Sequence, residues 1–283
     1  MKKAFSLTEL AVVLLVITLL ASLIAKGSDM IQASRIATAR ALTSTSPVPK
    51  VPGLVAWYES TLKESFPSNE QKQKESSKIS TWYDVSPSSI VDQKNALTRI
   101  ANSSVTFEPI GINKLPSIRF DGSGEIDLSN FYQGDLRNKT FFIIFQPHDI
   151  NGTPHILSTD DTEKAIGITA NTIALWGGSK TVSSATGSNA ADFNLGKNYV
   201  IAAYFNGATS ESYDNDTENR TGDAAIAADT IITSRGLAIG GNSSGSYFTG
   251  FISEVVVYNR LVTDQERRDV MRYLAQKWEI TLE

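Results

Sequence analysis

Residues 250–260 read GFISEVVVYNR. Apolar and β-branched side chains dominate this stretch, and Gly250 and Asn259 flank it, which is the pattern of a β-strand between turns. Comparable apolar runs occur at residues 54–58, 117–120, 141–145, 199–205 and 236–240. Glycine and asparagine turn signals separate them, at residues 121–122, 151–152, 177–178, 206–207 and 240–242. Many short strands with such turns predict a mainly β protein, a sandwich or a barrel. No helical crossovers alternate with the runs, so a parallel α/β sheet is not expected.

A helix is expected directly after residues 250–260. Thr263 and Glu266 have the spacing of a capping box, in which each side chain bonds the backbone of the other residue. Behind this cap, four apolar side chains recur at helical spacing on one face. They are Val270, Tyr273, Leu274 and Trp278. The helix is therefore expected to pack against the β-structure.

Five pieces of the sequence, in this order, resemble the concanavalin A-like, laminin-G-like domains of bacterial surface proteins. They are WY at 57–58, TWYD at 81–84, FDG at 120–122, the stretch at 250–260 and YLAQKW at 273–278. The likeness spans roughly residues 54–280 and predicts a domain at 54–283. It implies a jelly roll of two antiparallel sheets. Domains of this family usually bind carbohydrate or protein, sometimes with calcium.

The N-terminal segment is apolar from Leu10 to Ala25, apart from Thr18 and Ser22. A helix from residue 5 to 25 is about 30 Å long at about 1.5 Å per residue, which matches the hydrocarbon core of a bilayer. A membrane span at about residues 5–25 is therefore expected. Lys2 and Lys3 precede it and place the N-terminus in the cytoplasm.

Glu9 is unusual because an ionised carboxylate in a membrane segment is costly and marks function. Residues 1–9 resemble the signal of type IV prepilins and type II secretion pseudopilins, in which a basic leader precedes Phe and the fifth mature residue is Glu. Ala4, Phe5 and Glu9 match these positions. The resemblance implies that residues 1–4 are a leader, that a prepilin peptidase cuts between Ala4 and Phe5, and that Phe5 is N-methylated. Glu9 of one subunit would neutralise the Phe5 amine of its neighbour in a filament. The alternatives are a secretory signal and a plain single-span anchor.

Helix-forming residues continue to about residue 43, so a pilin-type helix is expected at 5–43. Its second half is less apolar and is suited to packing on the domain. Pro47, Pro49 and Pro52 follow, and three prolines end a helix and stiffen the chain. Residues 44–53 are therefore expected to be a linker.

Composition excludes several function classes. The net charge of -4 argues against a nucleic-acid partner, because neutralising a phosphate backbone needs a basic surface. The chain has no cysteine, which excludes disulfides, zinc–thiolate sites and a cysteine nucleophile.

One constellation is suggestive of catalysis. Glu125-Ile126-Asp127 resembles part of the Glu-x-Asp-x-Glu motif of jelly-roll glucanases, whose side chains share one strand face. Ser129 and Asn130 stand where the second glutamate, the general acid, is required. The chain is therefore predicted not to be an enzyme, with no catalytic residues. His148 and His155 lack a third ligand and are expected to be solvated loop residues.

Two groups are candidates for ligand binding. Asp214, Asp216 and Glu218 form an oxygen-rich segment that suits calcium, the one cofactor considered, although a solvated acidic loop is the alternative. Trp82 and Trp176 are candidates for stacking on a sugar, and burial in the core is the alternative.

The sequence thus predicts a minor pilin or pseudopilin-like filament subunit. It is anchored in the bacterial inner membrane and then enters a periplasmic or extracellular filament. Its β-sandwich displays a binding face for carbohydrate or other surface ligands. The expected partners are other pilin-like subunits, the inner membrane, a prepilin peptidase and a carbohydrate or surface ligand, but no nucleic acid. The alternative is a membrane-tethered lectin-like module that does not polymerise, and a pilus is not distinguished from a secretion pseudopilus.

Overall fold

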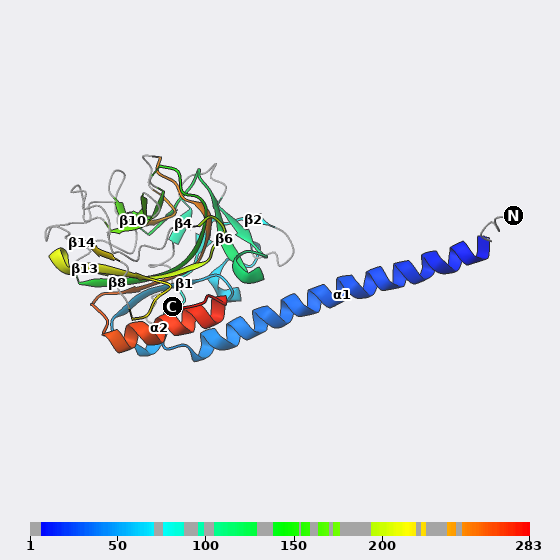
Figure 1. Ribbon diagram of the computed structural model, residues 1–283, viewed down its shortest axis with the longest axis horizontal. Helices are drawn as coiled ribbons and strands as arrows, with labels where there is room; N and C mark the ends of the chain where they lie inside the picture. Colours follow the sequence, from blue (N-terminus) through cyan, green and yellow to red (C-terminus); the bar gives the residue numbers. More distant parts are fainter. Residues whose placement is uncertain are drawn as a thin grey trace.

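The computed structural model describes residues 7–70, 76–87, 96–98, 105–128, 138–152, 154–158, 164–169, 172–175, 194–218, 222–224, 237–241 and 245–283. A long helix projects from a β-sandwich, and a second helix lies along the sandwich near its base (Figure 1). The architecture is mainly β, with two antiparallel sheets, a long N-terminal apolar helix and a C-terminal helix, as the sequence predicts.

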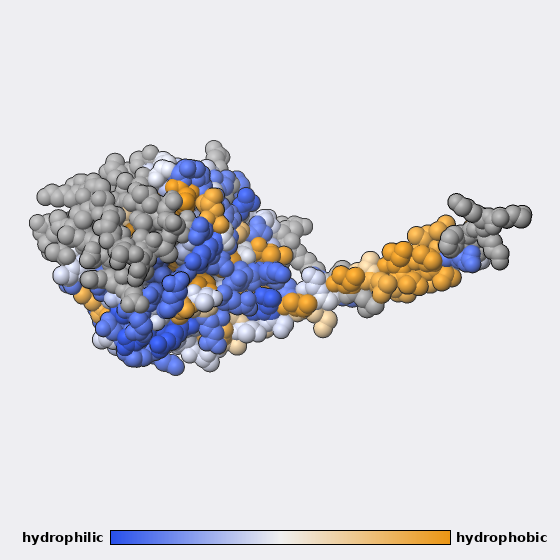
Figure 2. Space-filling model, in the orientation of Figure 1, coloured by the Kyte–Doolittle hydropathy of each residue, from blue (hydrophilic) through white to orange (hydrophobic). Residues whose placement is uncertain are grey.

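The helix α1 runs without interruption from Leu7 to Thr45. Its first half carries exposed Leu, Val and Ile side chains and is long and apolar enough to cross a membrane. Figure 2 shows this apolar surface on the free part of the helix. By length and composition, this helix fits a membrane anchor or a signal sequence.

The larger sheet contains nine strands in the part of the chain that the structure describes. Its order is β14-β13-β12-β8-β16-β6-β5-β2, with β1 also paired to β16, and each pair is antiparallel. The strands are β1 Leu54–Glu59, β2 Ser77–Lys78, β5 Thr106–Glu108, β6 Ser117–Asp121, β8 Lys139–Asp149, β12 Tyr199–Phe205, β13 Ser210–Asp214, β14 Gly222–Ala224 and β16 Thr249–Tyr258.

The smaller sheet contains seven strands among the described residues, in the order β11-β10-β9-β15-β7-β4-β3. They are β3 Thr81–Trp82, β4 Ala96–Thr98, β7 Ile126–Asp127, β9 His155–Ser158, β10 Lys164–Thr169, β11 Thr172–Leu175 and β15 Ala238–Ile239. The 3₁₀ turns are η1 Val48–Lys50, η2 Lys63–Ser65, η3 Ile112–Lys114 and η4 Gly207–Thr209.

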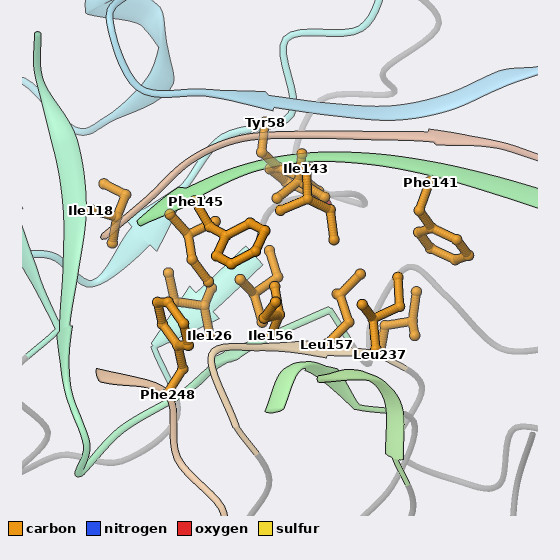
Figure 3. Packing of buried hydrophobic residues seen from close by; sticks show 14 of the residues in the cluster. Tyr58, Ile118, Ile126, Phe141, Ile143, Phe145, Ile156, Leu157, Leu237 and Phe248 are labelled. Atoms are coloured by element: carbon orange, nitrogen blue, oxygen red, sulfur yellow. The ribbon is translucent and has the colours of Figure 1, made fainter. Parts of the chain in front are cut away.

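Two hydrophobic clusters give the molecule three layers. The first fills the space between the sheets, where side chains such as Phe145, Ile126 and Leu157 interdigitate (Figure 3). The second lies on the other face of the larger sheet, beneath α2 (Asp264–Trp278) and the end of α1. The larger sheet is therefore covered on both faces.

Strand β16 shows why its sequence is almost continuously apolar. Val255 and Val257 lie in the first cluster, and Val256 and Tyr258 lie in the second. Because successive side chains point to opposite faces, a strand between two cores needs apolar residues at nearly every position.

The C-terminal helix has the predicted capping box. Thr263 Oγ1 accepts from the backbone nitrogen of Glu266, and the Glu266 carboxylate accepts from the backbone of Thr263. The four apolar side chains predicted on one face are buried in the second cluster. This confirms the predicted packing.

The proline-rich segment ends α1 as predicted, but it does not span a gap. Val48 and Val51 are buried in the second cluster. The Tyr258 hydroxyl donates to Val48 O at 2.9 Å, and Arg260 Nε donates to Pro52 O at 2.8 Å. The segment is therefore part of the packed domain, because its valines pack in the hydrophobic cluster on the larger sheet.

Candidate functional site

The two faces of the smaller sheet differ in character. One cross-strand row points into the core and contains Ile126, Ile239, Leu157, Ile166 and Leu175. The neighbouring row runs across the same strands on the opposite face, since alternate residues face opposite ways. Its members are Thr81, Leu97, Asp127, Ala238 and Ser158. This second row lies on the side of the smaller sheet away from the core, its outer face, where Leu97 is exposed and Ala238 and Ser158 are buried.

Asp127 supplies the carboxylate of this outer face. Ile126 and Leu128 pack in the core, so alternation directs Asp127 and Glu125 to the other side of the sheet. Glu125 is fully buried, whereas Asp127 is half-buried. The neighbours Ala238 and Ser158 are small, and Ser158 Oγ donates to Gly241 O. Asp127 is thus the half-exposed carboxylate of this row, beside the buried Ala238 and Ser158.

A second polar constellation lies between the helices and the larger sheet. Glu59 and Glu254 are directly opposite each other across the β1–β16 ladder, and both are fully buried. Lys277 of α2 reaches between them, with Nζ 2.5 Å from Glu59 Oε1 and 2.9 Å from Glu254 Oε2. Two carboxylates of like charge are tolerated side by side because the ammonium bridges them.

Neutral donors complete this buried cluster. The indole nitrogens of Trp57 and Trp278 donate to Glu254 at 2.8 and 2.9 Å, and the Tyr273 hydroxyl donates at 3.0 Å. Burial, followed by the charges of Glu254 and Glu59, raises the pKa of Tyr273 well above its ordinary value, so the phenol remains a donor. With the ion pairs, these bonds hold α2 on the sheet.

Polar contacts also attach α1 to the domain. Arg40 Nε donates to Thr61 O at 2.7 Å, and Gln32 Nε2 donates to Lys114 O at 2.5 Å. Arg35 pairs with Glu279 at 3.5 Å. The second half of α1 is thereby fixed to the sandwich, while its first half projects freely (Figure 1).

The structure places the predicted processing and assembly residues at the tip of α1. Glu9 lies in the first turn of the helix, and its side chain is exposed. Ala4 and Phe5 lie outside the described residues.

The predicted sugar-stacking tryptophan Trp82 belongs to the core. Its side chain is fully buried, stacks on Phe66 at 6.2 Å between ring centroids, and contacts Tyr58. Its indole nitrogen donates to Glu59 O. Both ring faces are covered, so Trp82 offers no platform to a sugar, and the core alternative holds. Trp176 lies outside the described residues.

The predicted calcium residues Asp214, Asp216 and Glu218 are not arranged as a group that could hold a metal ion. In the ranges that the structure describes, no group of three or more His, Asp or Glu side chains is suited to a metal ion. The Asp216 carboxylate accepts a hydrogen bond from the backbone nitrogen of Glu218, and the exposed Glu218 side chain forms ion pairs with Arg268 and Arg272. Asp214 lies inward on β13, where burial and then the charge of Asp216 raise its pKa to about 7.

The two histidines are far from equivalent. His148 lies exposed on β8 of the larger sheet, with its ring edge against Phe251. His155 is buried on β9 of the smaller sheet, so the expectation of two solvated loop histidines is wrong for it. Among the described residues, neither histidine belongs to a group of three or more side chains that could hold a metal ion.

The comparison with protein families decides the classification. Residues 120–266 match the concanavalin A-like lectin/glucanase superfamily, laminin-G type. The chain belongs to this superfamily. No curated protein matches it.

Several solved structures share the fold of this lectin/glucanase domain. A mutant of Trypanosoma rangeli sialidase displaying trans-sialidase activity matches with 19% identity and a TM-score of 0.50, over 82% of this chain and 34% of the sialidase. A GH54 α-L-arabinofuranosidase matches with 10% identity and a TM-score of 0.50, over 71% of this chain and 51% of the enzyme. Domain 4 of AbnA, a GH43 arabinanase from Geobacillus stearothermophilus solved with arabinotriose, matches with 15% identity and a TM-score of 0.48, over 77% and 97% of the two chains. The lectin/glucanase chain spans about a third of the length of the sialidases it matches.

These neighbours correct one prediction. The chain was predicted not to be an enzyme, and that exclusion is wrong, because the solved structures that share its fold include glycoside hydrolases. At such low identities the likeness shows the fold alone. It therefore removes the exclusion without assigning an activity to this superfamily member.

Sequence reasoning did not single out Glu59, Glu254 or Lys277. A signal was present for two of them: Glu254 interrupts the apolar run of β16, and Lys277 lies seven residues after Val270 on the apolar face of α2. A charge at an otherwise apolar position indicates a buried partner of opposite charge.

Proposed function

We propose that this protein is a membrane-anchored, pilin-like filament subunit that displays a carbohydrate-binding sandwich. One observation carries the proposal: α1 is a single continuous helix whose free half exposes apolar side chains and whose other half is bonded to a lectin/glucanase domain. Because the helix is continuous and bonded to the domain, its placement in a membrane or filament also fixes where the domain lies.

Filament assembly is supported by the residues at the start of α1. The match of Ala4, Phe5 and Glu9 to a prepilin signal predicts a free amine at Phe5 after cleavage. An amine and a carboxylate are each costly in apolar surroundings, so pairing the Phe5 amine with Glu9 of a neighbouring subunit sets the stagger between subunits. The inner membrane and the prepilin peptidase are the partners in this step.

The mass of the mature N-terminus tests this part of the proposal. Protein purified from a bacterium with a prepilin peptidase is expected to begin at N-methylated Phe5. An intact Met1 would instead support the tethered module that does not polymerise, and a cut after residue 20 would indicate a secretory signal.

Carbohydrate binding is proposed for the outer face of the smaller sheet. The superfamily description, lectin and glucanase, motivates the ligand class, and Asp127 among small neighbours supplies the acceptor for sugar hydroxyls. The full chain in detergent is expected to bind members of a polysaccharide panel, and Asp127→Asn is expected to weaken that binding. The matched control is Asp269→Asn, since Asp269 is an exposed carboxylate on α2. Equal binding by wild type and Asp127→Asn would reject this face.

Glycoside hydrolysis is a second candidate for the same face. It is motivated by two carboxylates that lie two residues apart, Asp127 in β7 and Glu125 directly before it, since glycosidases use paired carboxylates; Asp127 is half-buried and Glu125 is fully buried. The same panel is assayed for released reducing ends. Release that is lost in Glu125→Gln supports hydrolysis, whereas binding without release supports the lectin role.

A further inference from the structure

The loop between β5 and β6 meets α1 just beyond its apolar segment. Gln32 Nε2 donates to Pro109 O at 3.3 Å and to Lys114 O at 2.5 Å, and Arg35 Nη1 donates to Asn113 O at 3.5 Å. In Figure 1, β6 and β2 lie at the edge of the sandwich from which α1 projects. This loop is therefore fixed to α1 at the edge of the domain nearest the apolar segment.

Exposed apolar side chains lie at the same level of α1 as this contact, on the helix and on the loop. Met30 is 73% exposed and Ile31 is 62% exposed, and both precede Gln32 on α1. Ile110, the neighbour of Pro109 in the loop, is 61% exposed. In the described part of the sandwich, the other large apolar side chains that are exposed are Leu97 and Leu195. We call Met30, Ile31 and Ile110 the juxtamembrane patch.

The loop that exposes Ile110 is stabilised by backbone hydrogen bonds and by buried apolar side chains. Gly111 N donates to Leu115 O at 2.9 Å, and Lys114 N donates to Gly111 O at 3.0 Å. Ile112 and Leu115 are buried beneath this turn. Ile110 is the loop's apolar side chain that the turn leaves in water, so covering it costs little conformational entropy.

The position of the patch along α1 selects its partner. The apolar segment ends at Ala25, and Met30 follows about 8 Å further along the helix axis at about 1.5 Å per residue. The headgroup layer on each side of a bilayer is about 5–8 Å thick, and membrane helices tilt by about 20° on average. A tilt toward the loop therefore brings the patch into the headgroup layer. The exposed cations Lys26 and Lys114 lie near the patch and attract anionic headgroups, and Asp29, Glu108 and Glu279 are nearby opposing charges.

We propose that the juxtamembrane patch rests in the headgroup layer of the membrane that α1 spans, so that the sandwich leans on the lipid surface before assembly. The inference rests on the membrane anchor of the proposed function. It adds a second, shallow membrane contact, made by the sandwich itself, to the deep contact made by α1. Partly buried apolar side chains next to cations are the usual composition of such interfacial contacts.

The absence of cysteine makes a direct test simple, because each introduced cysteine is a unique labelling site. The full chain is placed singly in nanodiscs of phosphatidylethanolamine and phosphatidylglycerol. An environment-sensitive fluorophore is attached in turn to Ile110→Cys, Ile31→Cys, Ile17→Cys and Gln265→Cys. Ile17 reports on the apolar segment, and Gln265 is an exposed residue in the first turn of α2. The start of α2 lies far from the tip of α1 (Figure 1).

A quencher attached near the lipid headgroup is expected to quench the labels at positions 110 and 31, with a blue shift of their emission, and to leave position 265 unchanged. If positions 110 and 31 behave like position 265 while position 17 is shielded, the leaning domain is wrong and the anchor stands. If position 17 is also open to an aqueous quencher, the anchor itself fails. Shielding of position 110 that appears only with two chains per disc would assign the patch to a second copy and overturn the lipid contact.

Discussion

At the scale of single residues, the decisive group is Lys277. It is the cation between two fully buried glutamates, and its removal leaves Glu59 and Glu254 facing each other without it. Lys277→Met is expected to lower the free energy of unfolding by about 3–5 kcal/mol, the usual cost of breaking a buried ion pair from one side. Urea unfolding of the full chain in detergent, followed by tryptophan fluorescence, measures the change.

The control for this prediction is Gln276→Met, which alters the exposed neighbour and is expected to be nearly neutral. A triple variant with Glu59→Gln and Glu254→Gln added should recover part of the loss, because it removes the unpaired charges and keeps acceptors for the buried donors around them. A small effect of Lys277→Met would mean that the remaining donors suffice, which are the tryptophans and Tyr273 for Glu254 and the Thr61 and Leu62 groups for Glu59.

Asp214 gives the stability a pH dependence. Burial, and then Asp216, raises its pKa from 3.8 to about 7, with Lys197 partly opposing the shift. Between about pH 4 and about pH 7 the folded state therefore keeps a proton that the unfolded chain has lost. Stability from this group is highest below about pH 4 and falls as pH rises to about 7, by up to about 1.4 kcal/mol per unit.

Asp214→Asn removes this dependence. The variant is expected to gain stability relative to wild type as the pH rises from about 4.5 to about 7.5. Unfolding of both proteins across this range measures the difference. A difference that stays constant with pH would show that Asp214 does not titrate in the window.

At the scale of elements, the long apolar strands were predictable and the short ones were not. The runs in β1, β8, β12 and β16 contain enough apolar residues to predict a strand from local sequence alone. Strands β3 and β7 have two residues each, and their place in the sheet depends on register with neighbours distant in sequence. Trp82 lies on β3. Without the register of β3 in the sheet, the sequence does not distinguish a tryptophan that stacks on a sugar from one that is buried in the core.

The candidate site was predictable to the same extent. Alternation along a strand places Glu125 and Asp127 on one face, but only the pairing of β7 with β15 and β4 shows that this face is the outer one. The ion cluster joins residues that are 218 and 23 positions apart, a juxtaposition that local patterns do not contain.

The cap of α2 supplies a prediction at this scale. Thr263 satisfies backbone donors at the start of the helix that carries Lys277. Thr263→Ala is expected to cost about 1 kcal/mol in the free energy of unfolding. The matched control is Gln265→Ala at an exposed position in the first turn, which should change little. Equal effects of the two substitutions would show that the cap is not what stabilises this end of α2.

At the scale of the whole molecule, α1 and the sandwich are joined as one rigid unit. The hydrogen bonds of Gln32 and Arg40 fix α1 to the domain, and the cluster around Lys277 fixes α2 to the larger sheet. A force or a stagger imposed on the apolar half of α1 therefore reaches the domain. Within an assembly of parallel α1 helices, each subunit would present the outer face of its smaller sheet away from the helices, since the larger sheet separates them.

A substitution at Glu9 tests whether α1 assembles into a filament through its N-terminal end. Glu9→Ala removes the carboxylate but keeps the apolar helix, so membrane insertion and cleavage before Phe5 are expected to persist while incorporation into filaments falls sharply. The readouts are the mature mass of the membrane-bound protein and its amount in sheared filaments. Ser6→Ala is the matched control, because it changes the same end of the chain without removing a charge. Assembly of Glu9→Ala at the wild-type level would remove the proposed pairing with the Phe5 amine, and α1 would then be an anchor whose partner is the lipid alone.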